Sequence, residues 1–163
     1  MKANPYADDL GAREPVGVMA ETPKKLSELL NQFPAEQLDQ KPAPDKWSVR
    51  EIMCHLADCE IVFAWRLRLN YEQHHPMLQP FDQDGWAKIY KAYTFHQARL
   101  TFDATRMWNL AFIAGLSEED RKRPARHPER GELTLWTTVE TIAGHDLHHL
   151  KALAEMPKVT GVA

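Results

Sequence analysis

The residues best suited to chemistry in this chain are histidines near its carboxyl end, in the run GHDLHH from residue 144 to 149. His145 and His149 are four positions apart, so on a helix they lie about 40° apart around the axis and one turn apart along it. At this spacing two imidazoles can bind one metal ion, with zinc–nitrogen distances of about 2.0–2.1 Å. The apolar positions of the segment lie beside both residues, whereas His148 falls on the polar side. The spacing therefore predicts His145 and His149 as a ligand pair at the edge of a core.

A third histidine occupies the same kind of position on another predicted helix. His55 lies beside the apolar positions Ile52, Leu56 and Phe63, again at the edge of a buried face. Three histidines from two helices can meet at one end of a helical core. Three neutral ligands that leave coordination positions open are typical of a catalytic metal site rather than a structural one.

Spacing alone leaves a second interpretation open, in which these histidines only pack and form hydrogen bonds in the core. Other metal sites are less well supported. The sequence contains no HExxH motif, which argues against a zincin-type protease. A di-iron carboxylate bundle needs two Glu-x-x-His motifs, and the chain offers only Glu72-x-x-His75, which runs into a proline.

The composition limits the class of protein. The chain has 163 residues, is 44% hydrophobic, and has a net charge of −3 from 20 basic and 23 acidic residues. No apolar run approaches the roughly 20 residues that span a bilayer, and no basic cluster predicts a nucleic-acid partner. Two cysteines, Cys54 and Cys59, are few for a disulfide scaffold, and the amino terminus has no signal-peptide core. We therefore expect a cytoplasmic protein with reduced thiols and no membrane partner.

The elements that must position the histidines are predicted to be helices. Ser48 and Glu51 form a capping box that predicts a helix from Ser48 to about Glu72. Thr94 and Gln97 predict the start of a second long helix that ends near Gly115. Thr134 caps the helix that carries His145 and His149.

The remaining segments complete the predicted bundle. A first helix begins near Pro15 and extends toward Phe33, with Pro23 either bending it or starting a second segment, and a short helix covers residues 86–93. The charged segment 117–132 is predicted to be a loop or a short helical turn, and no segment alternates clearly enough to predict a strand. We expect one all-α domain over residues 1–163, a four-helix bundle with its core at about 15–153 and peripheral ends at 1–14 and 155–163.

Several motifs together resemble the DinB/YfiT-like superfamily. They are the run WSVRE from Trp47, HLAD from His55 with Glu60, PFDQDGW from Pro80, Arg106, the segment from His127 to Thr134, and HDLHHL from His145. The resemblance spans roughly Pro15 to Leu153, and its specificity lies in the combination of motifs. It implies an up-down-down-up four-helix bundle that binds one divalent metal through His55, His145 and His149.

The resemblance says less about the reaction. Some members of the family are transferases and isomerases that use low-molecular-weight thiols such as bacillithiol and mycothiol, which implies a small-molecule substrate, a thiol cosubstrate and a metal-bound thiolate. The alternatives are a hydrolase that uses a metal-bound water, and a non-catalytic metal-binding module of a stress response. Zinc, nickel, iron or manganese suits such a site, with zinc or nickel the leading expectation. A homodimer is also expected from the family.

Residues around the ligands could orient them, because a metal-bound imidazole usually donates its second N–H to an acceptor. Asp58, Glu51 and Thr141 lie on the polar side of a ligand histidine at helical spacing and are the candidates for this role. Cys59 lies about 40° from His55, which makes a mixed cysteine–histidine site conceivable, with small apolar packing as its other role. No general acid or base is predicted beyond the metal-bound species.

Glu60 faces the buried flank of its helix and needs a partner there. Arg106 borders the apolar face of the long helix predicted to begin at Thr94 and end near Gly115. We predict a buried Glu60–Arg106 ion pair that fixes the register of the two helices.

Overall fold

Four long helices form the body of the protein in the computed structural model, which describes residues 2–158. They are α2 (Pro15–Leu30), α3 (Val49–Glu72), α5 (Phe95–Ala114) and α7 (Leu135–Glu155). The predicted four-helix bundle is confirmed. Met1 and residues 159–163, part of the ends expected to be peripheral, lie outside the described residues.

Shorter elements connect and cover these helices. They are α1 (Ala7–Leu10), η1 (Ala35–Gln37), α4 (Gln83–Ala87), η2 (Tyr90–Ala92), α6 (Glu118–Arg121), β1 (Pro124–His127) and β2 (Gly131–Thr134). The single helix expected over residues 86–93 is instead divided between α4, which begins earlier, and the 3₁₀ turn η2.

The long helices begin where the capping signals predict. The Ser48 side chain accepts a hydrogen bond from the Glu51 N–H, and the Glu51 carboxylate accepts one from the Ser48 N–H. Thr94 and Gln97 form the same reciprocal pair at the start of α5. Pro23 lies inside a continuous α2, so it does not start a second segment.

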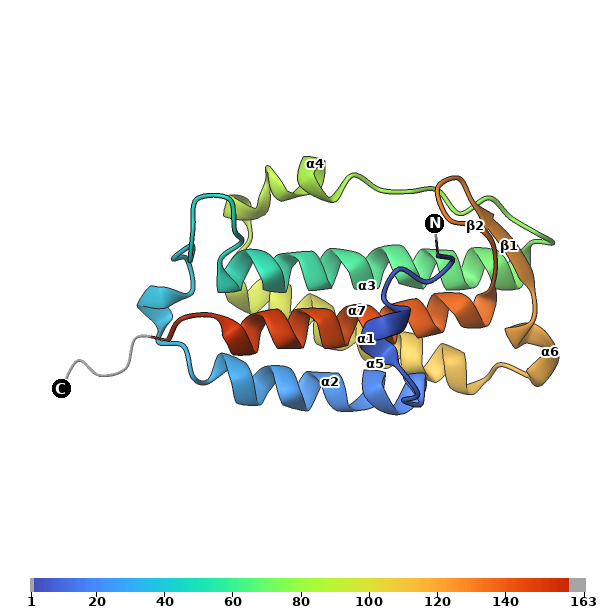
Figure 1. Ribbon diagram of the computed structural model, residues 1–163, viewed down its shortest axis with the longest axis horizontal. Helices are drawn as coiled ribbons and strands as arrows, with labels where there is room; N and C mark the ends of the chain where they lie inside the picture. The colour runs from blue at the N-terminus through green and yellow to red at the C-terminus, as the bar shows by residue number, and fades with distance from the viewer. Residues whose placement is uncertain (1, 159–163) are drawn as a thin grey trace.

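The order of helix directions follows from one long connection. In Figure 1, α2 and α3 run in opposite directions, whereas α5 runs in the same direction as α3 and α7 returns alongside α2. The chain between α3 and α5 passes along the length of the bundle and carries α4, which makes the parallel α3–α5 pair possible (Figure 1). The arrangement is the up-down-down-up bundle that the resemblance implied.

The expectation of no strands is wrong at one place. Residues of β1 and β2 form an antiparallel pair, from Pro124 opposite Thr134 to His127 opposite Gly131, and Gly131 turns the chain with φ +76°. Each strand has only four residues, and charged side chains occupy several of them, so the alternation of burial is too short to detect in the sequence.

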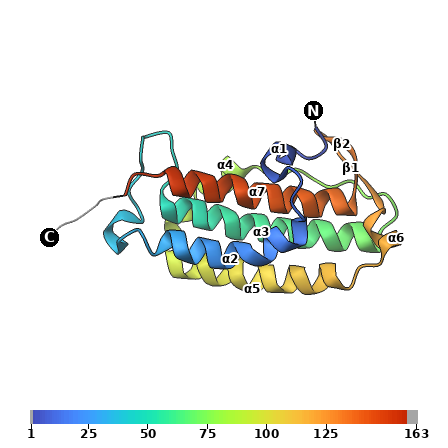
Figure 2. The same ribbon diagram turned by 60° about the horizontal axis from the view of Figure 1, so that its bottom comes forward.

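The amino-terminal segment packs closely on the bundle, beside the helix that carries two candidate ligands. Figure 2 shows α1 over α7, on the opposite side of the bundle from α5. At Gly144 a Cβ atom would lie 2.5 Å from the Tyr6 carbonyl oxygen, so only glycine allows this approach. Leu10 is buried with the core residues Leu135 and Val139. Among the described residues, no helix is both long and apolar enough to span a membrane.

Candidate metal centre

The structure brings the three predicted histidines together between α3 and α7. The ring centroids of His55 and His145 lie 5.1 Å apart, those of His55 and His149 4.9 Å, and those of His145 and His149 4.4 Å. The Nε2 atoms of His55 and His145 are 3.0 Å apart. All three side chains are buried. The helical wheel therefore correctly placed each of them at the inner edge of its helix.

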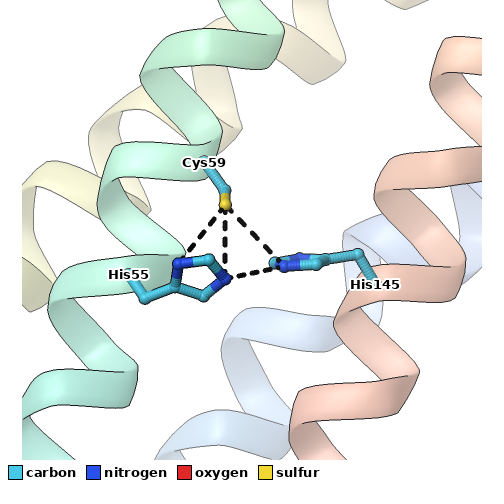
Figure 3. Close-up of side chains that lie close together, drawn as sticks. All are labelled: His55, Cys59 and His145. Atoms are coloured by element: carbon cyan, nitrogen blue, oxygen red, sulfur yellow. Dashed lines mark hydrogen bonds between the residues drawn. The ribbon is translucent and has the colours of Figure 1, made fainter. Parts of the chain in front are cut away.

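The Cys59 thiol lies beside the rings of His55 and His145 (Figure 3). Its Sγ lies 3.5 Å from His55 Nε2 and 3.7 Å from His145 Nε2. His55, Cys59 and His145 thus form a compact group in which one donor atom from each residue lies within 4.8 Å of the others. From the sequence, a site containing Cys59 and His55 was one of two interpretations, because a buried cysteine in a helix commonly only fills space.

These separations suit a shared metal ion. Two nitrogen ligands at about 2.0–2.1 Å from a tetrahedral ion lie about 3.3 Å apart, and a sulfur ligand at about 2.3 Å lies about 3.6 Å from each nitrogen. The observed spacings of 3.0, 3.5 and 3.7 Å are close to those values. The donor-atom distances therefore fit a site made of His55, Cys59 and His145. The centroid of the His149 ring lies 4.9 Å from that of His55 and 4.4 Å from that of His145, which makes His149 the alternative third ligand.

Burial keeps the histidines in the form that binds metals. It lowers the pKa of His55 to about 4 and that of His149 to about 3, and the neighbouring histidines add to both effects. Burial, followed by the charge of His149, also holds the pKa of His145 well below its usual range. Neutral imidazoles have a free lone pair, so no proton needs to be displaced at neutral pH. By contrast, burial raises the pKa of the Cys59 thiol far above its ordinary value.

A cavity reaches this cluster from the surface. It has a volume of about 600 Å³ and is lined by His149 and His148 of α7, by Trp47 and Ile52 at the start of α3, and by residues of α4 and of the chain after α7. The Trp47 ring also packs on His55, with centroids 4.6 Å apart. A small molecule in this cavity would contact an apolar wall and the edge of the histidine cluster.

The three residues proposed to orient the ligands lie elsewhere. Glu51 caps α3 and forms an ion pair with Lys41 at 3.0 Å. The Thr141 hydroxyl donates to the Thr137 carbonyl oxygen at 2.7 Å. Asp58 lies near Tyr90 at the interface with η2, where burial raises its pKa. In the described part of the chain, none of the three forms a hydrogen bond with His55, His145 or His149. Their role in orienting the ligand histidines therefore stays a prediction.

A buried ionic network lies next to the cluster and joins all four long helices. Arg106 of α5 donates to Glu60 of α3 at 2.7 Å, which confirms the predicted pair. The same guanidinium donates to both carboxylate oxygens of Asp146 of α7, at 2.6 and 2.9 Å, and to the Met19 carbonyl oxygen of α2 at 2.9 Å. Asp146, the neighbour of His145, was missed, although its position in the HDLHH run is the signal that could have drawn attention to it.

The amino-terminal segment covers the other side of His145. The Tyr6 ring meets the His145 ring edge-on, with centroids 5.2 Å apart, and the Asp9 carboxylate lies 3.7 Å from His148 Nδ1. This contact could not be predicted, because the segment before Pro15 has little apolar periodicity.

The remaining histidines divide into two groups. In the sequence, His74, His75, His96 and His127 have no partner at ligand spacing, which predicts surface or loop positions for all four. The first three are exposed, but His127 lies in β1 and is only 2% exposed, so the prediction is wrong for His127. The hairpin that buries it is the element that the sequence did not reveal.

Comparison with known proteins agrees with this architecture. The sequence profile of the DinB superfamily matches residues 19–153. The chain belongs to the DinB superfamily. The match includes all of α3 and α5 and α7 as far as Leu153, and with them every residue of the candidate centre.

Two relatives match this chain over most of their own length. One is a protein of Oceanobacillus iheyensis, 27% identical over 144 residues that cover 88% of this chain and 84% of the relative. The other is YfiT of Bacillus subtilis, 25% identical over 150 residues that cover 90% and 84%. The names of both relatives assign them, by inference, as metal-dependent hydrolases.

The solved structure of Bacillus subtilis YfiT has the same fold. It superposes on this DinB chain with a TM-score of 0.80 and 24% sequence identity, covering 87% of this chain and 83% of that one. It is described as a four-helix bundle of unusual topology. The likeness supports the helix order seen here.

Proposed function

We propose that this DinB-superfamily protein is an enzyme that depends on one divalent transition metal, held by His55, His145 and His149. The observation that carries the proposal is the convergence of three neutral, buried imidazoles beside a cavity that a small molecule can enter. A histidine cluster that only packed in the core would need no such cavity. Zinc and nickel are the first metals to test, since neutral imidazole ligands suit both.

When bound, a divalent ion would supply positive charge that favours the ionised form of a nucleophile at neutral pH. The protein's own residues do the rest. His55 and His145 are nearly inaccessible, so they fix the position of the site, whereas His149 borders the cavity. Trp47 and Ile52 line the approach with apolar surface, which favours an apolar portion of the substrate and excludes water.

Transfer of a thiol to an electrophile is the reaction that we propose first. Among the described residues, the compact donor group around His55 and His145 contains nitrogen and sulfur but no carboxylate oxygen. Hydrolytic histidine sites commonly place a glutamate beside the metal as a general base. A thiol with an ordinary pKa near 8.5 needs no such base. A carbon–sulfur bond would form, the thiol proton would pass to solvent, and the leaving group would depart with its electron pair.

Hydrolysis is the second candidate, and the names of the relatives from Oceanobacillus iheyensis and Bacillus subtilis favour it. Water would then take the place of the thiol at the same site. A metal-binding module without turnover is the remaining possibility and is an outcome of the experiment below.

The test compares two sets of substrates with the zinc-loaded and nickel-loaded protein. One set pairs small thiols with aryl halide and epoxide electrophiles, and the other contains activated esters and amides. We expect thiol-dependent turnover that His145→Ala abolishes and that His74→Ala, a substitution at an exposed histidine, leaves unchanged. Ester or amide turnover without thiol would favour the hydrolase, and metal binding without any turnover would contradict an enzymatic role.

A further inference from the structure

A second, much smaller cavity lies between the β hairpin and the bundle. Its walls include Arg66 of α3, His127 of β1, and Arg130 between the strands. The volume is about 10 Å³, which is room for about one water-sized sphere. Phe63 also lines this cavity, and its ring packs against His145.

Arg66 is a buried cation without a counter-charge. Its side chain is 5% exposed, and one amino group donates to the Gln79 carbonyl oxygen. Its Nε–H has no acceptor, and across residues 2–158 no carboxylate forms an ion pair with it. A buried charge without a partner is strongly destabilising, so a guanidinium in this position is expected to have an anionic ligand.

His127 offers a second donor that lacks an acceptor. Its Nδ1 accepts a hydrogen bond from the Glu129 N–H at 3.3 Å, so the proton of the neutral ring is on Nε2. Burial lowers the pKa of His127, and the charges of Arg130 and Arg66 lower it further, which keeps the ring neutral. The Nε2–H is buried and has no acceptor among the described residues.

The surroundings of the cavity are electropositive. Burial lowers the pKa of Arg66 to about 10, and the charge of Arg130 contributes to the shift. The charge of Glu129 acts on both Arg66 and His127, and it has the opposite, smaller effect on their pKa values. Glu129 is exposed and forms no ion pair with either residue in the part of the chain that the structure describes.

We propose that this cavity binds a single negatively charged acceptor atom through the Nε–H of Arg66 and the Nε2–H of His127, with Arg130 supplying further positive charge. Two of the residues that line the cavity, Arg66 and His127, each have a buried donor that lacks an acceptor, and the cavity has room for about one water-sized sphere. Arg66 and Arg130 make its lining positively charged. A free halide ion meets these requirements, and so does one oxygen of a carboxylate. A carboxylate would enter after displacement of Ala3, the amino-terminal residue that lines the cavity.

The first test measures thermal unfolding of the metal-free wild-type protein in sodium chloride, sodium formate and sodium gluconate at equal ionic strength. Gluconate is the reference, because its six-carbon chain is too bulky for a cavity of about 10 Å³. An anion that binds the folded state raises the midpoint temperature, and the rise increases with its concentration relative to its Kd. Stabilisation by chloride alone would indicate a free halide, and stabilisation by formate would indicate a carboxylate oxygen. Equal midpoints in all three salts would overturn the proposal and indicate a water molecule in the cavity.

Two substitutions separate binding at this cavity from a general salt effect. Arg66→Met should abolish the difference between salts. Arg68→Met should keep it, because Arg68 bonds to Asn109 Oδ1 and the Ala64 carbonyl oxygen and does not line the cavity. An unchanged salt difference in Arg66→Met would contradict the assignment.

Arg130→Met protects the test against a failure of Arg66→Met to fold, because Arg130 is only half-buried. The substitution should raise the half-saturating anion concentration several-fold. An unchanged concentration would contradict anion binding in this cavity. Crystals of the wild type in sodium bromide give a direct check, with an anomalous peak expected between Arg66 and His127. None of these readouts involves turnover or metal, so they succeed or fail independently of the proposed enzyme.

Discussion

At the scale of single residues, the centre depends on the angular position of each side chain on its helix. His55, His145 and His149 could be predicted from the sequence because helical spacing alone decides which side of a helix a residue occupies. Cys59 could not be assigned in this way, since its contact with His145 depends on how closely α3 and α7 approach. The same limit applies to Asp146, whose partner lies on α5.

Two substitutions distinguish the possible donor sets at this scale. We expect His149→Ala to lose the bound metal, because it removes one of three imidazoles. Cys59→Ser should keep it, because burial disfavours the thiolate and three neutral nitrogens remain. Metal content and the spectrum of the cobalt-substituted protein provide the measurements. A thiolate-to-cobalt charge-transfer band in the wild type, together with metal loss in Cys59→Ser, would make Cys59 a ligand.

At the scale of elements, the polar network around Arg106 fixes how the helices that carry the ligands are arranged. One guanidinium contacts a carboxylate of α3, a carboxylate of α7 and a carbonyl oxygen of α2. Its side chain is 1% exposed, and the two carboxylates raise its pKa above the ordinary value despite the opposing effect of burial. The sequence revealed the need of Glu60 for a cation but could not show that one arginine also serves Asp146.

Removing this cation should therefore be costly. We expect Arg106→Met to lower the free energy of unfolding by ~3–5 kcal/mol, because two carboxylates would stay buried without a counter-charge. Arg99→Met is the matched control on the same helix. It removes a partly exposed ion pair with Asp103 and hydrogen bonds to Pro23 and Ser27, but it leaves no fully buried charge, so we expect a loss of only ~1–2 kcal/mol. Urea denaturation of both variants checks the difference, and equal losses would contradict the role assigned to the network.

At the scale of the whole molecule, the sequence predicts the long helices well and the covering elements poorly. Capping boxes mark the starts of α3 and α5, and these signals are local. The hairpin and the amino-terminal segment are stabilised by contacts with distant parts of the chain, as at Tyr6 and Gly144, so no local pattern announces them. The small cavity at Arg66 depends on the hairpin and was missed for the same reason.

The buried histidines also make the stability of the whole metal-free protein depend on pH. Folding lowers the pKa of His55 to about 4 and that of His149 to about 3. The unfolded chain therefore binds more protons below pH 6.5, and the stability that is present above that value is lost as the pH falls toward 4. Each histidine should contribute a slope of roughly 1.4 kcal/mol per pH unit over that range.

Urea denaturation between about pH 7.5 and about pH 4.5, a range that spans the titration of an ordinary histidine, tests this dependence. The double variant His55→Gln/His149→Gln removes two of the three buried histidines of the candidate centre, whose pKa values are lowered, and it should show a shallower slope than the wild type. Identical slopes would mean that neither histidine resists protonation in the folded state.

The most direct test of the central claim is the metal content of the tag-free protein after dialysis against zinc or nickel, for the wild type beside His145→Ala. His145 belongs to both candidate donor sets, the one with Cys59 and the one with His149, so its loss should remove the metal whichever set is used. We predict about one equivalent in the wild type and almost none in a folded His145→Ala variant. A wild type that binds no metal, or a folded variant that binds as much as the wild type, would contradict the account.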